Sequence, residues 1–394
     1  MSCTRPILFF VLLASACAAP SVEDAGTALD AGGQEDNVDG GGQTNSDAGQ
    51  ERPADAGEVS NVDGGQSASD AGGEANVDAG GSNPGTHSYF AHGAFFHEDV
   101  SAAAKSPDSD VIIAALDAAG GWGHSNVFQI DFSIDVLTAT ASTPMRSFIP
   151  SSAHYDPDCD TTPMPIPVDG NIEGEDGYAC TQDGDCHLLV FAAHENRLYE
   201  MWRADIPDDD AVNGTFNGGC LATWDTSRVY PATGRGDQCT SADAAGFPIA
   251  PLLFSADEVA AGEINHAIRL ILPNDRVRAR RYVRPATHGT NTSGGANAPQ
   301  YGVHFRLRAD YPVDTLPTEG ARVVARALQK YGMYHADGGQ IALTAQSDKH
   351  TTAKWEGLLG PRDLDDLQVS DFEVLYHSDD IEVTFDCTRT PLTE

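Results

Sequence analysis

A long acidic tract of short repeats near the N-terminus limits most strongly what this chain can fold into. Asp-Ala-Gly begins at residues 24, 30, 47, 55, 70 and 78, and Asn-Val-Asp begins at residues 37, 61 and 76. The tract is poor in aromatic and large aliphatic side chains, so folding could not recover the entropy lost on ordering it. We therefore predict a disordered, self-repelling tether over residues 17–87. Residues 88–394 remain for a single globular domain.

The segment before the tether is typical of an export signal. Arg5 supplies a positive start, an apolar run follows at residues 7–13, and the small residues Ala14-Ser15-Ala16 precede Cys17. The apolar run is shorter than the roughly 20 residues that a membrane-spanning helix needs. We therefore predict that residues 1–16 are a signal peptide that is removed.

Small residues directly before a cysteine resemble the bacterial lipobox. This resemblance implies that Cys17 is lipidated and that the protein contacts the membrane through its lipid anchor. Ala18, after the cysteine, implies the outer membrane or the cell surface as the location. An ordinary signal peptide cut near Ala19 is the alternative.

The net charge of −36 restricts the classes of partner. Residues 21–85 hold 14 acidic residues and one basic residue, so the tether carries about −13 and the rest of the chain is also acidic. A polyanion would be repelled, whereas a nucleic-acid-binding protein gains affinity by releasing counterions from phosphates. We expect no nucleic acid partner, and we expect a monomer.

Six cysteines remain once Cys3 leaves with the signal peptide and Cys17 takes lipid: Cys159, Cys180, Cys186, Cys220, Cys239 and Cys387. An even number in an oxidising compartment predicts three disulfides, with 15 pairings open. The turn-rich loop between Cys180 and Cys186 favours a local bridge there. No Cys-x-x-Cys motif is present, so a zinc site is not favoured.

Strand patterns dominate the domain. From Phe128 to Val136, apolar and polar residues alternate strictly, which is typical of a strand with one buried face. Further strands are expected at 187–193, 197–204, 221–225, 266–272, 281–284, 302–309, 341–345, 372–376 and 381–386. Glu195-Asn196 could close a hairpin between the first two of these. About ten short strands and few helices predict a mainly β fold, a β-sandwich or jelly-roll decorated by short helices.

Helix signals are few. Asp108 or Ser109 can cap a short helix at 111–116, and Ser255 with Glu258 forms a capping-box pattern. Thr318 can cap a helix through Leu328 that ends at Gly332.

Several stretches between residues 160 and 340 resemble a family of secreted bacterial proteins without a characterised activity. The stretches are PMPIP at 163, IEG at 172, GDCHLLV at 184, LYEMWRA at 198, TSADAAGFPI at 240, GEINHAIR at 262, PATH at 285 and KYGMYHADGG at 330. The resemblance implies common ancestry and brings no activity with it. The function must therefore be argued from the residues.

Two acidic residues stand out as catalytic candidates. Glu200 interrupts an apolar strand and shares a strand face with Trp202, where an indole could stack on a sugar and partial burial could raise the carboxyl pKa. Asp243 lies among small residues that allow close approach of a ligand. We predict these two as an acid–base pair positioned by His187 and His266. A salt bridge for Glu200 and a turn cap for Asp243 are the structural alternatives.

Other residues are candidates for contacting a ligand: Trp202, Trp224, Arg306, His288 and Tyr331. Tyr199, Tyr331 and Arg306 would serve a lyase instead of a hydrolase. The arginines at 276, 278, 280, 281, 284, 306 and 308 could hold an acidic glycan, or they could pair with the protein's own abundant carboxylates. Internal ion pairs are the favoured interpretation of that group.

Metal sites receive little support from the sequence. His266, His288 and His304 could ligate a metal, but hydrogen-bonded histidines are the more ordinary interpretation. Asp156, Asp158 and Asp160 alternate as in a calcium loop, although the glycine and glutamate that complete such a loop are replaced by Thr161 and Pro167. We expect no metal or cofactor, with calcium at 156–160 as the alternative.

Three functions fit these observations. The domain could cleave extracellular polysaccharide as a glycoside hydrolase or lyase, it could bind glycan without cleaving it, or it could be a structural lipoprotein of the cell envelope. Polysaccharide cleavage is the hypothesis we place first. A pair of neighbouring carboxylates beside an accessible aromatic ring would favour cleavage.

Overall fold

A computed structural model describes residues 89–91, 93–181, 184–207 and 214–392. The predicted signal peptide, the predicted lipidation site Cys17 and the predicted tether lie outside these residues. The described residues contain two main β-sheets, which meet along an extensive buried apolar core. None of the helices in the described part of the chain is long and apolar enough to cross a membrane.

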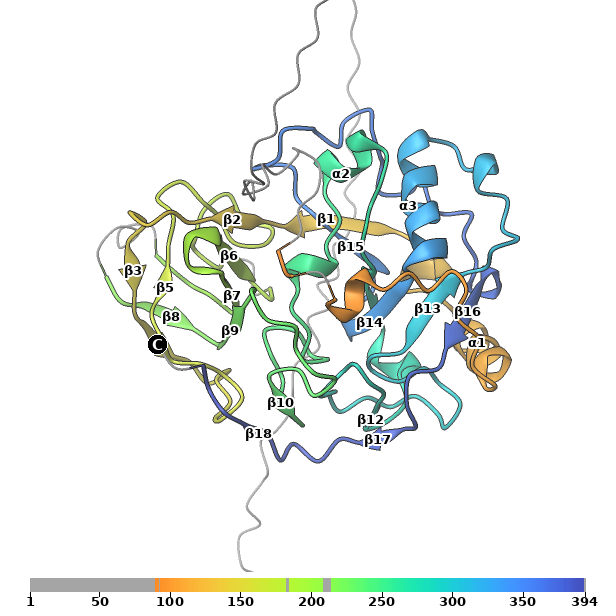
Figure 1. Cartoon of the computed structure of the whole chain (residues 1–394), viewed down its shortest axis with the longest axis horizontal. Coiled ribbons are helices and arrows are strands. Elements are labelled where there is room, and N and C mark those ends of the chain that lie inside the picture. Colours follow the sequence, from red (N-terminus) through yellow and green to blue (C-terminus); the bar gives the residue numbers. More distant parts are fainter. Residues whose placement is uncertain (1–88, 92, 182–183, 208–213, 393–394) are drawn as a thin grey trace, which may run out of the picture. The chain divides into compact units, whose positions relative to one another are not determined.

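The larger sheet has six strands of mixed direction (Figure 1). In spatial order they are β1 (Ile130–Ile134), β15 (Leu343–Gln346), β11 (Ile268–Leu272), β14 (Met333–Gly338), β13 (His304–Leu307) and β16 (Phe372–Leu375). The pairs β1·β15 and β11·β14 are parallel, whereas β13 pairs antiparallel with both β14 and β16. The strands at the centre of this sheet, β11 and β14, are buried along most of their length, which is why they position polar groups firmly.

The smaller sheet has four strands: β2 (Val136–Thr138), β6 (Leu188–Ala192), β7 (Arg197–Trp202) and β9 (Cys220–Asp225). The hairpin predicted between the strands at 187–193 and 197–204 is confirmed. β6 and β7 pair antiparallel, and Asn196 adopts a left-handed turn conformation between them. β7 also pairs antiparallel with β9.

One continuous strand was expected over Phe128–Val136, and the structure corrects this. The chain breaks at Asp135, so that β1 joins the larger sheet and β2 joins the smaller one (Figure 1). Asp135 is buried and its carboxylate accepts a hydrogen bond from the Asn171 amide. This short junction connects the two sheets covalently.

Four two-stranded ribbons complete the β structure. They are β3 (Met145–Arg146) with β5 (Met164–Pro165), β4 (Phe148–Pro150) with β8 (Phe216–Gly218), β10 (Gly236–Asp237) with β18 (Thr388–Arg389), and β12 (Arg281–Tyr282) with β17 (Ile381–Glu382).

Three α-helices are described: α1 (Ser109–Ala118), α2 (Ala256–Ala261) and α3 (Glu319–Lys330). The capping box predicted for α2 is confirmed, since the Ser255 side chain accepts from the Glu258 amide and Glu258 bonds back to the backbone of Ser255. Thr318 caps α3 as predicted. α3 packs on β13 and α1 on β16 (Figure 1). The prediction of a mainly β body with a few short helices is therefore confirmed.

The three predicted disulfides are also confirmed. They join Cys159 to Cys220, Cys180 to Cys186, and Cys239 to Cys387. The local bridge expected in the loop before β6 is among them. The bridge from Cys239 joins the segment after β10 to the segment before β18, and so holds that ribbon together.

We expect the Cys159–Cys220 bridge to stabilise the fold more than the Cys180–Cys186 bridge. The two bridges close loops with sequence separations of 61 and 6. Loop-closure entropy then predicts losses of about 4 and about 2 kcal/mol on removal of the respective bridge. Urea denaturation of the two double alanine variants measures both losses. Equal losses would contradict the entropic account.

Candidate functional site

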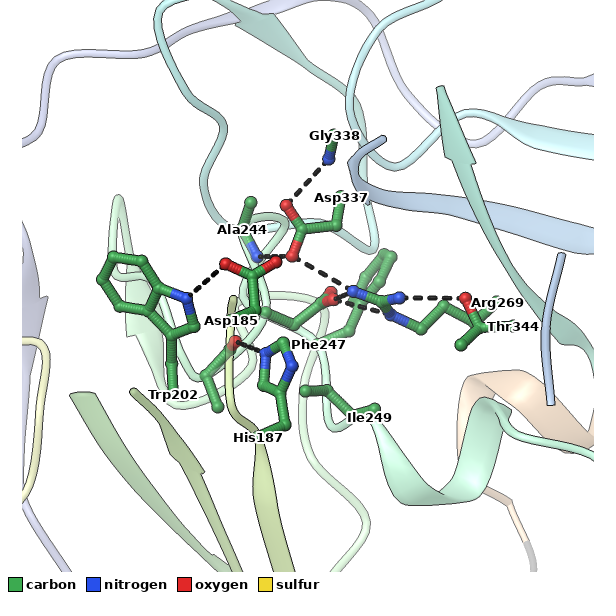
Figure 2. Close-up of polar contacts among 12 residues, drawn as sticks. Asp185, His187, Trp202, Ala244, Phe247, Ile249, Arg269, Asp337, Gly338 and Thr344 are labelled. Carbon is green, nitrogen blue, oxygen red and sulfur yellow. Dashed lines mark hydrogen bonds and ion pairs between the residues drawn. The ribbon is translucent and has the colours of Figure 1, made fainter. Parts of the chain in front are cut away.

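Three segments far apart in the sequence bring a buried arginine and two aspartates together (Figure 2). Arg269 lies on β11 and Asp337 on β14. Asp243 lies in the loop after β10. The Arg269 Nη2 atom lies 2.8 Å from Asp243 Oδ1 and 3.1 Å from Asp337 Oδ2. Nη1 donates to Thr344 Oγ1 at 3.0 Å and Nε to Asp243 Oδ1 at 2.9 Å. The guanidinium is thus fully engaged in holding the two carboxylates.

Asp243 forms the buried end of this group. Its side chain is shielded from solvent, and burial raises its pKa to about 7 against the opposing effect of Arg269. The Oδ2 atom is buried and has no hydrogen-bond partner among the described residues. Because Asp243 cannot reach solvent, it contributes to the site through Arg269. The predicted role as one half of an acid–base pair is replaced by a supporting position.

Asp337 forms the accessible end. Its side chain remains 24% exposed. Oδ1 accepts from the Gly338 amide at 2.8 Å, and Oδ2 accepts from the Ala244 amide at 3.4 Å as well as from Arg269. Burial raises the pKa of this carboxyl, and the neighbouring carboxylate of Asp185 raises it further. Asp337 is therefore held in a fixed place with an increased affinity for a proton.

Asp185 lies next to Asp337 at the partly exposed edge of the site. Figure 2 shows its carboxylate between the Trp202 indole and the Asp337 carboxylate. The Trp202 Nε1 atom donates to Asp185 Oδ1 at 2.9 Å, and no described residue bonds Oδ2. Both Asp185 and Trp202 are partly exposed. Two carboxylates, one with a raised pKa, thus lie beside an accessible indole.

A second aromatic ring accompanies Trp202. Tyr155 lies parallel to it within 10°, with ring centroids 6.5 Å apart, and is 51% exposed. Parallel, exposed aromatic rings are the surfaces on which sugar rings stack. The prediction that Trp202 can contact a ligand is therefore compatible with its position.

His187 directly precedes β6 and contacts the loop that carries Asp243. Its Nδ1 atom lies 2.6 Å from Glu173 Oε2, and its Nε2 atom lies 3.1 Å from the carbonyl oxygen of Ala242. The Glu173 carboxylate outweighs burial and raises the pKa of His187 to about 9, and the histidine in turn lowers the pKa of Glu173 to about 2 despite its burial. The charged imidazole therefore holds the backbone next to Asp243 in place.

Glu200 does not join this group at the surface. It is fully buried on β7, where Oε2 accepts from Trp224 Nε1 at 3.0 Å and Oε1 accepts from the amides of Ile249 and Ala250 at 2.8 and 2.7 Å. Burial raises its pKa to about 7. The structure places Glu200 as a cap for the turn at 249–250, and both Glu200 and Trp224 are buried.

The remaining candidates are dispersed and internally bonded. His266 lies 3.3 Å from Glu258, and His288 bonds the Ala244 carbonyl. Arg306 pairs with Glu373 at 2.6 Å, and the hydroxyls of Tyr331 and Tyr199 donate to Asn265 and Glu195. His304 bonds His377 and the Tyr331 carbonyl. The three histidines considered as metal ligands therefore have separate partners.

Asp158 and Asp160, in the alternative calcium site at 156–160, already bind other protein groups. Asp160 pairs with Arg235 at 2.7 Å and with Arg389, and it accepts from the Thr223 amide, while Asp158 accepts from the Thr240 amide. Among the described residues, Asp158 groups with Cys239 and Cys387 in a set of the size a metal would need, but those cysteines are joined in a disulfide. The donors at 156–160 are thus largely occupied by protein groups.

The arginine group after β11 is used internally, as favoured from the sequence. Arg278 pairs with Asp380, Arg281 with Glu382 and Arg284 with Asp237. Arg276 and Arg280 donate to backbone carbonyls, among them Gly120 and Val383.

Asp185, Arg269 and Asp337 were missed as site residues, although they lie in the stretches GDCH, NHAIR and YHADGG. One signal was present: Arg269 interrupts the apolar run Ile268–Leu272, where a charge must find an internal partner. No protein-family model matches the chain, and neither does any curated protein sequence or solved structure. The family resemblance therefore stays a prediction.

Replacing Glu200 by glutamine should destabilise the fold by about 2 kcal/mol, because the new NH₂ group would face N–H donors that now bond a carboxylate. Asp185→Asn, at the partly exposed edge, should change the free energy of unfolding by less than about 0.5 kcal/mol. Urea denaturation at pH 8 measures both. An unchanged free energy of unfolding in Glu200→Gln would contradict the capping role.

The His187–Glu173 pair should make stability fall at alkaline pH. Because the pKa of His187 is raised from 6.5 to about 9 on folding, its contribution is complete below pH 6.5 and is lost as pH rises through 9. The loss should be on the order of 3 kcal/mol. Unfolding free energies of wild type and His187→Gln, compared between pH 7.5 and 9.5, test this: the slope should be much weaker in the variant. Parallel slopes would rule the pair out as its cause.

Proposed function

We propose that the chain is an exported, lipid-anchored surface protein whose domain cleaves extracellular polysaccharide as a glycoside hydrolase. One observation carries the proposal: the accessible Trp202 indole is fixed by hydrogen bond to Asp185, which lies beside Asp337, a carboxyl with a raised pKa. Hydrolysis of a glycosidic bond needs an acid and a base that flank the bond, near a surface that holds the sugar ring.

The two carboxyl groups take different roles. Asp337, whose pKa is raised by burial and by the charge of Asp185, acts in its protonated form and gives its proton to the glycosidic oxygen as the bond from that oxygen to the anomeric carbon breaks. Asp185, with Oδ2 unbonded by the described residues, takes a proton from the water that attacks the anomeric carbon. One water is consumed, and Asp337 regains a proton from Asp185 through solvent.

The groups behind this pair keep it in place. Arg269 fixes Asp337 and is itself held by the buried Asp243 and by Thr344. Such rigid support is what a catalytic pair requires, since small misplacements reduce rates strongly.

A second candidate function is glycan binding without cleavage. The parallel rings of the exposed Tyr155 and the partly exposed Trp202 favour it, because two such rings can contact sugars without any catalytic group.

Asp337→Asn and Asp185→Asn should each lower kcat/KM on the cleaved polysaccharide by at least about 100-fold, as expected for loss of a general acid or base. Asp366→Asn, which removes the same charge from an exposed position, is the matched control and should retain full activity. Wild-type activity should decline at high pH as the acid loses its proton. Release of reducing ends from a panel of neutral and acidic polysaccharides measures all three.

If the wild-type domain released no reducing ends but was retained by one polysaccharide in affinity electrophoresis, the hydrolase proposal would fail in favour of glycan binding. Absence of both cleavage and retention across the panel would remove the polysaccharide as partner. Full activity of Asp337→Asn would remove Asp337 from the mechanism.

A further inference from the structure

Arg203, directly after β7, differs from most arginines of the domain. Most of the other described arginines pair with carboxylates, as do Arg235, Arg278 and Arg284. In the described part of the chain, no carboxylate or carbonyl bonds the Arg203 guanidinium, and its Nε atom is buried without a hydrogen-bond partner. A protein with 59 acidic and 23 basic residues could easily have paired it. A guanidinium left unpaired amid excess acid is available for a ligand.

The position of Arg203 links it to the candidate site. Its guanidinium carbon lies over the Trp202 ring, 5.2 Å from the centroid. Its backbone amide donates to the Asp185 carbonyl at 2.8 Å. The Asp185 carboxylate accepts from the Trp202 indole through Oδ1 and forms no ion pair with this guanidinium. The cation is therefore fixed beside the indole and the proposed catalytic pair.

The backbone of Arg203 is strained, which points in the same direction. Its φ is +56°, in the left-handed region that side chains other than Gly and Asn rarely adopt. The segment keeps this shape because Gly219 donates to the carbonyls of both Trp202 and Arg203 at 3.1 Å. A residue held in such a conformation costs about 1–3 kcal/mol and is concentrated at binding sites. Glycine would fit with less strain, but it would supply no cation.

We propose, resting on the polysaccharide-cleaving function above, that Arg203 and Trp202 form a subsite for a sugar that carries a carboxylate, so that the substrate class is a uronate-containing polysaccharide. The indole stacks on the sugar ring, and the guanidinium fork pairs with the carboxylate in the two-pronged geometry that arginine favours. The recognising arginine is thus Arg203 and not the internally paired group at 276–284.

The acidic charge of the domain opposes a polyanion at long range but not at this contact. At physiological salt, charges farther apart than about 8 Å are largely screened. The pairing with Arg203 acts at hydrogen-bond distance beside an aromatic ring, where screening is weaker. Binding is therefore best measured at 150 mM salt.

The test compares polygalacturonate, alginate and hyaluronan with the carboxyl-reduced form of each polymer, in affinity electrophoresis with the non-cleaving Asp337→Asn variant. At least one uronate polymer should be bound about tenfold more tightly than its reduced form. Adding Arg203→Gln should lower affinity for that polymer about tenfold and leave affinity for the reduced form unchanged. Arg203→Lys, which keeps the charge but not the fork, should fall between.

Arg228 provides the matched control. It also lies over an aromatic ring, that of Tyr230 at 5.5 Å, and no described carboxylate pairs with it. Arg228→Gln removes the same charge from the turn that follows β9 and should leave binding unchanged. Circular dichroism and urea midpoints check that each variant is folded.

The outcomes separate this inference from the hydrolase proposal. Binding of uronate that depends on Arg203, without release of reducing ends by the wild type, supports the subsite and overturns the enzyme. Cleavage of neutral polymers with no preference for uronate supports the enzyme and overturns the subsite. Equal effects of Arg203→Gln and Arg228→Gln, or no binding of any uronate polymer, also overturn the subsite.

Discussion

The buried ion-pair group of Asp243, Arg269 and Asp337 is the interaction on which the site depends. Charges are costly to bury unless they are paired and hydrogen-bonded, and removing one partner of a buried pair costs about 3–5 kcal/mol. Arg269 meets this requirement with two carboxylates and the Thr344 hydroxyl. Because the three charged residues come from β11, β14 and the loop after β10, satisfying the arginine also fixes how these segments pack.

Local patterns predicted the parts of the fold that local chemistry determines. The β6–β7 hairpin and the capping box at Ser255 follow from a few adjacent residues, and both are present. The central strand β14 was missed, because His335 and Asp337 interrupt its apolar pattern and glycines flank it. Only the neighbouring strands β11 and β13 make this segment extended. The extended conformation of β14 therefore depends on pairing with neighbouring strands and not on local sequence preference.

The site residues were predicted only in part, because their positions also depend on tertiary packing. A period of two correctly puts Glu200 and Trp202 on one face of β7, but it does not show which end of the strand reaches solvent. Glu200 lies in the interior, whereas Trp202 lies at the edge. Asp185 and Asp337 approach one another only when the two sheets meet, and no sequence spacing encodes that distance. The residue types indicated which chemistry the site could perform, but only the fold showed which of these residues lie close together at the surface.

The bond between Cys239 and Cys387 has a consequence for the order in which the molecule is completed. Its two halves are separated by 148 residues, so Cys239 cannot find its native partner until all of those residues have been synthesised. Thr240 follows immediately and begins the loop that carries Asp243 to Arg269. In a partly synthesised chain, the loop that carries Asp243 therefore lacks its covalent link to the C-terminal segment.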